Sequence, residues 1–308
     1  MPPSPPRDDR YTGIFGVTVT PFTPDGRGID EAGLRSLVDR LLAGGIDRIV
    51  PNGNTGEYHT LSAAERRHAA EIALSAARGR ARLVIVGVAG AVEDAVAAAR
   101  HAADHGADAV MVHHPVHPYV TSEGLIAYLS AIAAGSPLPI VPYPKVALDA
   151  GTARRLAEIP GVVAVKWGIN DLPAFAAAVA ATRDLPVEWI CGTAELWAPF
   201  YWAVGATGFT SGLVNVNSER SLRLLAALNA GDRDETMRLW SEIQPFEALR
   251  ARRADGWNVA VVKAAMRILG LPAGPVRAPS SDVGAAEERE IAALLAAWGL
   301  ERAAVAVR

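Results

Sequence analysis

Cysteine, lysine and long apolar segments are all scarce in this sequence. Cys191 is the single cysteine among 308 residues, which excludes an internal disulfide framework and is typical of a reducing compartment. No apolar run reaches the roughly 18 residues that cross a bilayer, and the polar, proline-rich residues 1–10 lack the apolar segment of a signal peptide. We therefore expect a cytoplasmic protein that has no membrane partner and carries a disordered leader over residues 1–12.

An excess of charge of one sign is also missing. The formal net charge is −3 at pH 7, so the sequence gives no reason to expect nucleic acid or a membrane surface as a partner. The composition is that of a globular protein, with 50% hydrophobic and 20% charged residues. The length is within the range of a single α/β barrel domain.

Short β-rich segments alternate with helical ones along the chain. Eight such alternations predict a (β/α)8 TIM barrel, with the barrel core over residues 13–215 and the last barrel helix plus a helical extension over residues 216–308. A doubly wound open sheet is the alternative, but residues 19–22 after the first strand lack the glycine-rich phosphate loop of that fold. The predicted strands are residues 14–20, 46–51, 83–88, 107–112, 139–143, 162–166, 186–191 and 206–211.

The sixth predicted strand ends on Lys166, one of only three lysines among 30 basic residues. The preceding Val-Val-Ala-Val is typical of a fully buried strand of a parallel sheet. A buried ammonium group needs a lowered pKa, a strong partner or an exposed head. A lowered pKa would let the amine attack a carbonyl group. The alternative is a lysine that only marks where the strand reaches the surface.

Other polar residues stand at the ends of predicted strands, which a barrel brings together at one face. Residues 51–57 form a loop with two glycines that can point backbone N–H groups at an anion; an ordinary turn is the alternative. Tyr143, at the end of the fifth strand, could shuttle protons for a neighbouring lysine; the alternative is a rim aromatic. Cys191 is most simply a small buried hydrophobic residue.

Three histidines after the fourth strand raise a second hypothesis, a metal site. Imidazole is the commonest metal ligand, but His113 and His114 are adjacent and point to opposite faces of a strand. His117 follows three residues later, and the next acidic residue is Glu123. The pattern favours a polar rim, and we expect neither a metal ion nor a cofactor.

Five stretches together resemble the family of dihydrodipicolinate synthase and N-acetylneuraminate lyase, which are class I aldolases and dehydratases on a TIM barrel. The resemblance covers about residues 13–298. It implies that Lys166 forms an imine with a small-molecule 2-oxo acid, that Tyr143 relays protons, and that Thr55 binds the substrate carboxylate. It also implies a homo-oligomer, a dimer or a tetramer. The stretches are residues 17–22, residues 53–57, Tyr143, Lys166, and residues 205–208 with Asn215 downstream. The further substrate-binding residues expected on this basis are Asn54, Gly192, Thr210 and Lys145.

Departures from the family pattern bear on the substrate. Asn54 stands where the family usually has a hydroxyl residue, and His117 stands in place of a tyrosine from the neighbouring subunit. The synthase has an arginine shortly after its tyrosine for the second substrate's carboxylate; here Lys145 is the only cation nearby, and a point charge does not replace a bidentate guanidinium.

The C-terminal part of the chain resembles one branch of the family, that of 5-dehydro-4-deoxyglucarate dehydratase. The resemblance is carried by residues 252–257 and 270–279. We therefore expect a Schiff-base-forming lyase for a 2-keto-3-deoxy sugar acid. The alternatives are 4-hydroxy-tetrahydrodipicolinate synthase, a metal-dependent aldolase and a catalytically silent ligand-binding barrel.

Overall fold

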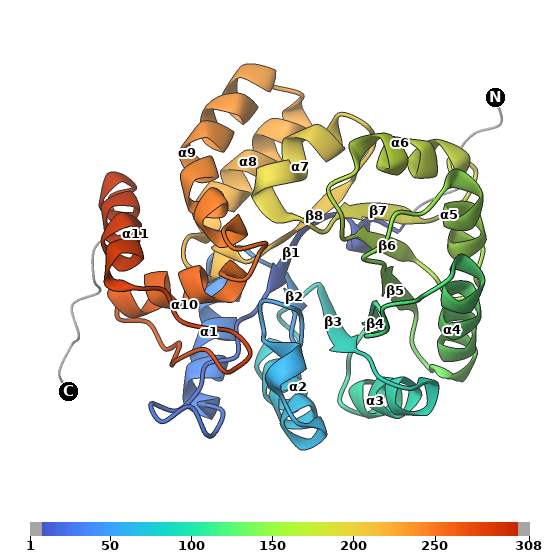
Figure 1. Ribbon diagram of the computed structural model, residues 1–308, viewed down its shortest axis with the longest axis horizontal. Coiled ribbons are helices and arrows are strands. Elements are labelled where there is room, and N and C mark those ends of the chain that lie inside the picture. Colours follow the sequence, from blue (N-terminus) through green and yellow to red (C-terminus); the bar gives the residue numbers. More distant parts are fainter. Residues whose placement is uncertain (1–7, 301–308) are drawn as a thin grey trace.

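The structure, a computed structural model, describes residues 8–300 and is a barrel of eight parallel strands surrounded by helices (Figure 1). Hydrogen-bonded neighbours follow the order β5-β4-β3-β2-β1-β8-β7-β6. The (β/α)8 prediction is confirmed, and each strand lies within its predicted range or one residue outside it. The strands are β1 Gly13–Val17, β2 Arg48–Val50, β3 Leu83–Val88, β4 Ala109–His113, β5 Ile140–Tyr143, β6 Ala164–Trp167, β7 Glu188–Cys191 and β8 Gly208–Ser211.

Contacts between β5 and the segment that leads into β6 complete the ring. Ile140 forms a parallel bridge with Val162. Its amide donates to the Gly161 carbonyl at 2.8 Å, and its carbonyl accepts from the Val163 amide at 3.3 Å. The carboxyl ends of all eight strands therefore meet at one face, where barrel enzymes carry their sites.

The helices begin at the caps that the sequence indicates. The Asp30 carboxylate accepts from the Gly33 amide, and Ser62 and Glu65 form a reciprocal capping box. Figure 1 shows α9, α10 and α11 grouped at one side of the barrel. The helices are α1 Glu31–Ala43, α2 Ala63–Ala77, α3 Val92–Asp104, α4 Ser122–Gly135, α5 Ala150–Ala157, α6 Leu172–Ala181, α7 Ala194–Trp202, α8 Ser218–Ala230, α9 Arg233–Ala251, α10 Asn258–Ile268 and α11 Ala285–Ala297, with short 3-10 helices η1 Asp9–Tyr11, η2 Tyr58–Thr60 and η3 Leu213–Asn215.

Strand β6 shows how the alternation of side chains places the lysine. Ala164 belongs to the apolar cluster inside the barrel, whereas Val165 and Trp167 belong to the cluster between strands and helices. Successive side chains of a strand point to opposite faces. Lys166 therefore points to the inside, as Ala164 does.

The predicted leader is too long at its C-terminal end. Asp9–Tyr11 forms η1, and Tyr11 is buried in the same interior cluster as Phe15. The Tyr11 ring packs in the barrel interior two residues before β1, so residues 8–12 belong to the folded part of the chain. The rest of the predicted leader, residues 1–7, lies outside the described residues. Among residues 8–300, no helix combines the length and the apolarity needed to cross a membrane.

Candidate active site

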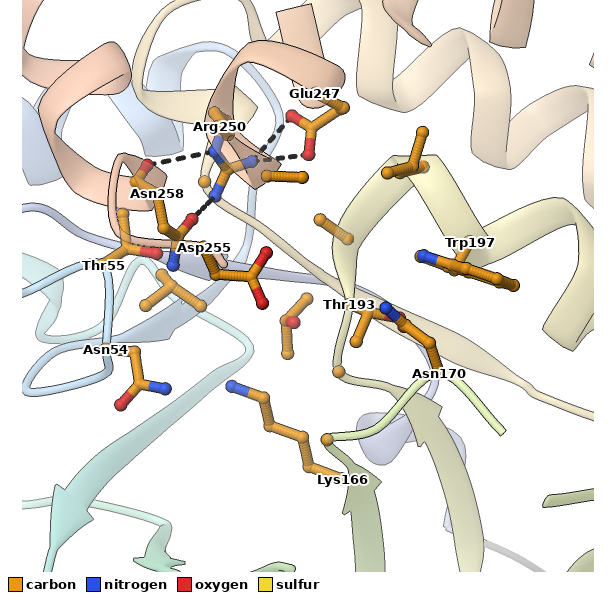
Figure 2. A pocket seen from close by; sticks show the side chains of 18 of the residues that line it. Asn54, Thr55, Lys166, Asn170, Thr193, Trp197, Glu247, Arg250, Asp255 and Asn258 are labelled. Atoms are coloured by element: carbon orange, nitrogen blue, oxygen red, sulfur yellow. Dashed lines mark hydrogen bonds and ion pairs between the residues drawn. The ribbon is translucent and has the colours of Figure 1, made fainter. Parts of the chain in front are cut away.

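A cavity of about 120 Å³ lies at the carboxyl ends of the strands, and all seven residues expected from the sequence line it. They come from five places in the chain: the loop after β2, the end of β5 and the residues after it, β6, the residue after β7, and β8. Figure 2 shows the amine of Lys166 pointing into this cavity. The seven residues are Asn54, Thr55, Tyr143, Lys145, Lys166, Gly192 and Thr210.

Lys166 is a buried amine with a lowered pKa. Its residue surface is only 4% exposed, so the alternative of a lysine that surfaces at the strand end is wrong. Burial, and secondarily the positive charge of Lys145, lowers its pKa to about 7. Its Nζ lies 3.9 Å from the centroid of the Tyr143 ring, and no carboxylate in residues 8–300 forms an ion pair with it. A substantial share of this side chain is therefore the neutral amine at pH 7.

Gly192 leaves room for the lysine side chain. A Cβ atom at this position would collide with the Trp167 carbonyl oxygen and lie 3.0 Å from Cγ of Lys166. Gly168 does the same for the tyrosine, because its Cβ atom would overlap the Tyr143 ring. Two glycines thus permit the close approach of β6, β7 and the ring from β5.

The Tyr143 phenol is buried and hydrogen-bonded to Asn54. The Asn54 amide donates to the Tyr143 hydroxyl at 3.1 Å. Burial, reinforced by the negative charge of Asp255, raises the pKa of the phenol. The hydroxyl therefore keeps its proton at neutral pH and can donate it into the cavity. An amide does not pass a proton on as a hydroxyl does, so the chain of hydroxyl groups expected from the family stops at Asn54.

The loop after β2, which carries Asn54 and Thr55, is held to α10 by a buried ion pair. Glu57 and Lys263 are both fully buried and in contact, and the Arg277 amide donates to the second Glu57 oxygen at 2.8 Å. The loop needs this support because Glu57 has a left-handed backbone, with φ of 55°. This role of Lys263 is absent from the sequence-based expectations, since its partner lies about 200 positions away.

We expect removal of Lys263 to destabilise the protein more than most substitutions. Lys263→Met leaves the Glu57 carboxylate buried without its counter-charge, which costs about 3–5 kcal/mol of unfolding free energy. The double variant Glu57→Gln, Lys263→Met removes both charges and should regain most of this loss. Denaturant melts of the three proteins test this. If Lys263→Met and the double variant were equally stable, the destabilisation could not be due to an unpaired Glu57 carboxylate.

Four polar residues of α9, α10 and the loop between them also line the cavity, and none of the four is among the site residues predicted from the sequence (Figure 2). Arg250 of α9 donates to both Glu247 oxygens at 2.6 and 2.8 Å, and to the Asn258 side-chain oxygen at 2.5 Å. An arginine therefore lines the site although none follows Tyr143 closely in the sequence. The fourth residue, Asp255, extends its carboxylate toward the centre of the cavity.

The loop that presents Asp255 has an unusual backbone. Arg253, Ala254 and Asp255 have φ of 57°, 53° and 64°, and each non-glycine residue in this left-handed region costs about 1–2 kcal/mol. Such strain persists where the surroundings enforce it and is concentrated at functional sites. No local sequence signal marks this loop, because glycine does not occupy these three positions.

His113, the last residue of β4, and His114 and His117 after it do not belong to any group of three potential metal ligands among the described residues. His113 is buried, its Nε2 lies 2.9 Å from the Asn52 carbonyl, and burial lowers its pKa to about 3. His117 is exposed, and its Nδ1 accepts from the Tyr119 amide. The nearby residues Val116 and Tyr119 are 100% and 81% exposed. The substitution of His117 for the family's intersubunit tyrosine stays a prediction, and Tyr119 is a second aromatic residue on the same loop.

The model of the dihydrodipicolinate synthetase family matches residues 10–298. The chain belongs to this family. Its relatives are named as synthases and dehydratases, and the chain is accordingly a lyase of the dihydrodipicolinate synthetase family. The expected class of enzyme is therefore confirmed.

The relatives of this family member carry two different activities in their names. A "Probable 5-dehydro-4-deoxyglucarate dehydratase 2" of Streptomyces coelicolor is 35% identical, over 94% of this chain and 90% of that protein. A 4-hydroxy-tetrahydrodipicolinate synthase of Methanothrix thermoacetophila is 33% identical, over 91% of this chain and 96% of that protein. The crystal structure of a dihydrodipicolinate synthase from Oceanobacillus iheyensis has a TM-score of 0.91 and 40% identity, over 94% of this chain and 97% of that one. Both activities are thus represented among proteins similar to this one.

Proposed function

We propose that this lyase acts through an imine between Lys166 and a 2-oxo acid. The neutral amine attacks the C2 carbonyl, the carbonyl oxygen is protonated and leaves as water, and a C=N bond remains. Tyr143 lies beside the amine and holds a proton that it can give to the departing oxygen and recover afterwards. The observation that carries the proposal is the buried Lys166 amine, with its lowered pKa, against the Tyr143 ring.

The substrate that we propose is a 2-keto-3-deoxy sugar acid. Beyond Lys166, the cavity is lined by hydrogen-bonding side chains at opposite walls, among them Asn170, Thr193 and Asp255. A hydroxylated chain can pair with such groups, whereas an unsubstituted aldehyde leaves them unsatisfied. The dehydratase name of the Streptomyces relative supports the same choice.

The bond that breaks depends on this substrate. The imine withdraws electrons from C2, so that a proton is lost from C3 and an enamine forms; expulsion of a β-hydroxyl group, with a proton, then releases water. Alternatively, the C3–C4 bond breaks, the C4 hydroxyl gives up its proton, and an aldehyde leaves. Thr55 and Lys145 line the cavity where the substrate carboxylate would bind next to the imine.

We expect the specificity constants to distinguish the two candidate activities. A deoxy-keto sugar acid should reach kcat/KM above about 10⁴ M⁻¹s⁻¹, the low end for a physiological substrate. Pyruvate with aspartate semialdehyde should be turned over far more slowly. A high value for that pair, with no turnover of the sugar acids, would assign the synthase activity instead. Trapping with borohydride in the same assays reports the imine separately from the choice of substrate.

We also propose that the protein is a cytoplasmic homo-oligomer, a dimer or a tetramer. The exposed apolar surface of Val116 and Tyr119 on one loop supports a contact with a second copy. Sedimentation should show a larger species for the wild type than for the variant Val116→Ser, Tyr119→Ser. An unchanged mass in the variant would remove this loop from the interface.

The buried Cys191, which forms no disulfide, is compatible with a reducing compartment. Cell fractionation tests whether the protein is found in the cytoplasm.

A further inference from the structure

Three side chains on the outside of the barrel bring two imidazoles and a carboxylate together. His101 and His105 lie one turn apart at the end of α3, and Glu71 belongs to the neighbouring α2. One ligand atom of each lies within 4.8 Å of the other two. These residues belong to neither the active-site cavity nor the proposed reaction. We propose that they form a binding site for a divalent transition-metal ion of the Zn²⁺ type.

Spacing along α3 sets up the two nitrogen ligands. Residues four apart lie on the same face of a helix, and a pair of histidines at this spacing is a recurrent zinc-binding arrangement. The two rings lie with their centroids 4.3 Å apart. Both rings therefore face the same gap between α3 and α2.

A hydrogen bond fixes the tautomer of His105 in the form that binds a metal. Its Nδ1 lies 2.8 Å from the His101 carbonyl oxygen and must donate to it. The lone pair of the neutral ring is then on Nε2, which lies 3.9 Å from a Glu71 oxygen. Metal-bound histidines nearly always donate their other ring N–H to such an acceptor. The ring is oriented for coordination without any change of tautomer.

The second imidazole and the carboxylate are already in contact. Nε2 of His101 lies 2.8 Å from the same Glu71 oxygen and donates to it in the metal-free protein. Binding would move this proton to Nδ1 and turn the Nε2 lone pair to the ion. His68 lies at the other Glu71 oxygen, 3.8 Å away, and is held by Glu31 through its second nitrogen at 2.8 Å. The carboxylate is thus approached by imidazoles on both sides.

The donor set and its dimensions select the metal. Donor atoms around a tetrahedral zinc ion, at about 2.0–2.1 Å from it, are about 3.3 Å apart. The Nε2 atoms of His101 and His105 lie 2.8 and 3.9 Å from the same Glu71 oxygen, on either side of this value. The side chains are partly exposed and can adjust. Two imidazoles suit zinc, nickel and copper, whereas calcium and magnesium require oxygen ligands. Water would complete the coordination, and the ion would link α2 to α3.

Calorimetric titration of the full chain with zinc sulfate, after treatment with a chelator, tests the site. We expect one ion to bind per chain. His105→Ala and Glu71→Gln should each weaken binding by about 100-fold or more, since loss of an outer-sphere partner alone costs about 10–100-fold. The matched control is His59→Ala, which removes an exposed histidine on η2 and should leave the affinity unchanged. Absence of saturable binding, or equal affinity in the three variants, would overturn the proposal.

The position of the ion provides a second readout that does not depend on the variants. Anomalous diffraction at the zinc edge should place one peak between Glu71, His101 and His105. A peak elsewhere, or none at a zinc concentration that saturates the calorimetric signal, would overturn the assignment. The site is remote from the proposed imine chemistry, so the result stands whichever substrate the enzyme takes.

Discussion

Substitution of Lys166 by alanine should abolish the adduct that borohydride traps with a 2-oxo acid and lower kcat by about 10⁴-fold or more, because the whole imine pathway is lost. Mass spectrometry of the trapped wild-type protein should place one reduced adduct on Lys166. Lys166→Arg keeps a positive charge but cannot supply a neutral amine, so it should be equally inactive. An adduct that persists in these variants on Lys145 or Lys263 would move the nucleophile.

The pH dependence of trapping follows from the same environment. Only the neutral amine attacks, and the pKa of Lys166 is lowered to about 7. The trapping rate should therefore rise as the pH increases through about 7, well below the range of an ordinary lysine. Lys145→Ala removes a positive charge that disfavours the ammonium form, so the pKa of Lys166 should rise and the profile should shift to higher pH. A profile that is identical in this variant would show that burial alone sets the pKa.

The part of the candidate site that lies at the ends of strands could be predicted from the sequence. Lys166, Tyr143 and the loop with Thr55 are far apart in the chain, but parallel strands of a barrel end at one face and bring them together. Alternation of side chains then decides that Lys166 faces the interior. These rules need only the strand boundaries, which buried β-rich segments mark clearly.

The part of the site supplied by the C-terminal helices could not be predicted in this way. Arg250 and Asp255 reach the cavity only because α9, α10 and the loop between them pack against the barrel. The loop also adopts three consecutive left-handed residues without a glycine to signal them. Tertiary packing, which a local pattern does not encode, determines both features. Tyr11, near the N-terminus, illustrates the same point. The proline-rich residues before it predict a disordered leader, although its side chain is part of the barrel interior.

The other large effect is expected at Tyr143. Tyr143→Phe keeps the ring that packs beside the Lys166 amine and removes only the hydroxyl, so the barrel should remain folded. Loss of a positioned acid–base group lowers kcat by about 10²–10⁴-fold. Borohydride should still trap substrate on Lys166, but more slowly, because formation of the imine loses its proton donor. Turnover at the wild-type rate would make this tyrosine an aromatic residue without a part in proton transfer.

The hydrogen bond from Asn54 provides the control for this interpretation. Tyr143→Phe also leaves the half-buried Asn54 amide without its acceptor, and the loss of stability should stay below the roughly 1–3 kcal/mol of a fully buried unpaired group. Asn54→Ala removes the amide but keeps the phenol, so a loss of kcat much smaller than that of Tyr143→Phe is expected if the hydroxyl carries the proton. Asn54→Thr places a hydroxyl beside the phenol and should retain activity. Equal losses in Tyr143→Phe and Asn54→Ala, measured as kcat at saturating substrate, would mean that the hydrogen bond between the two side chains matters and the phenolic proton does not.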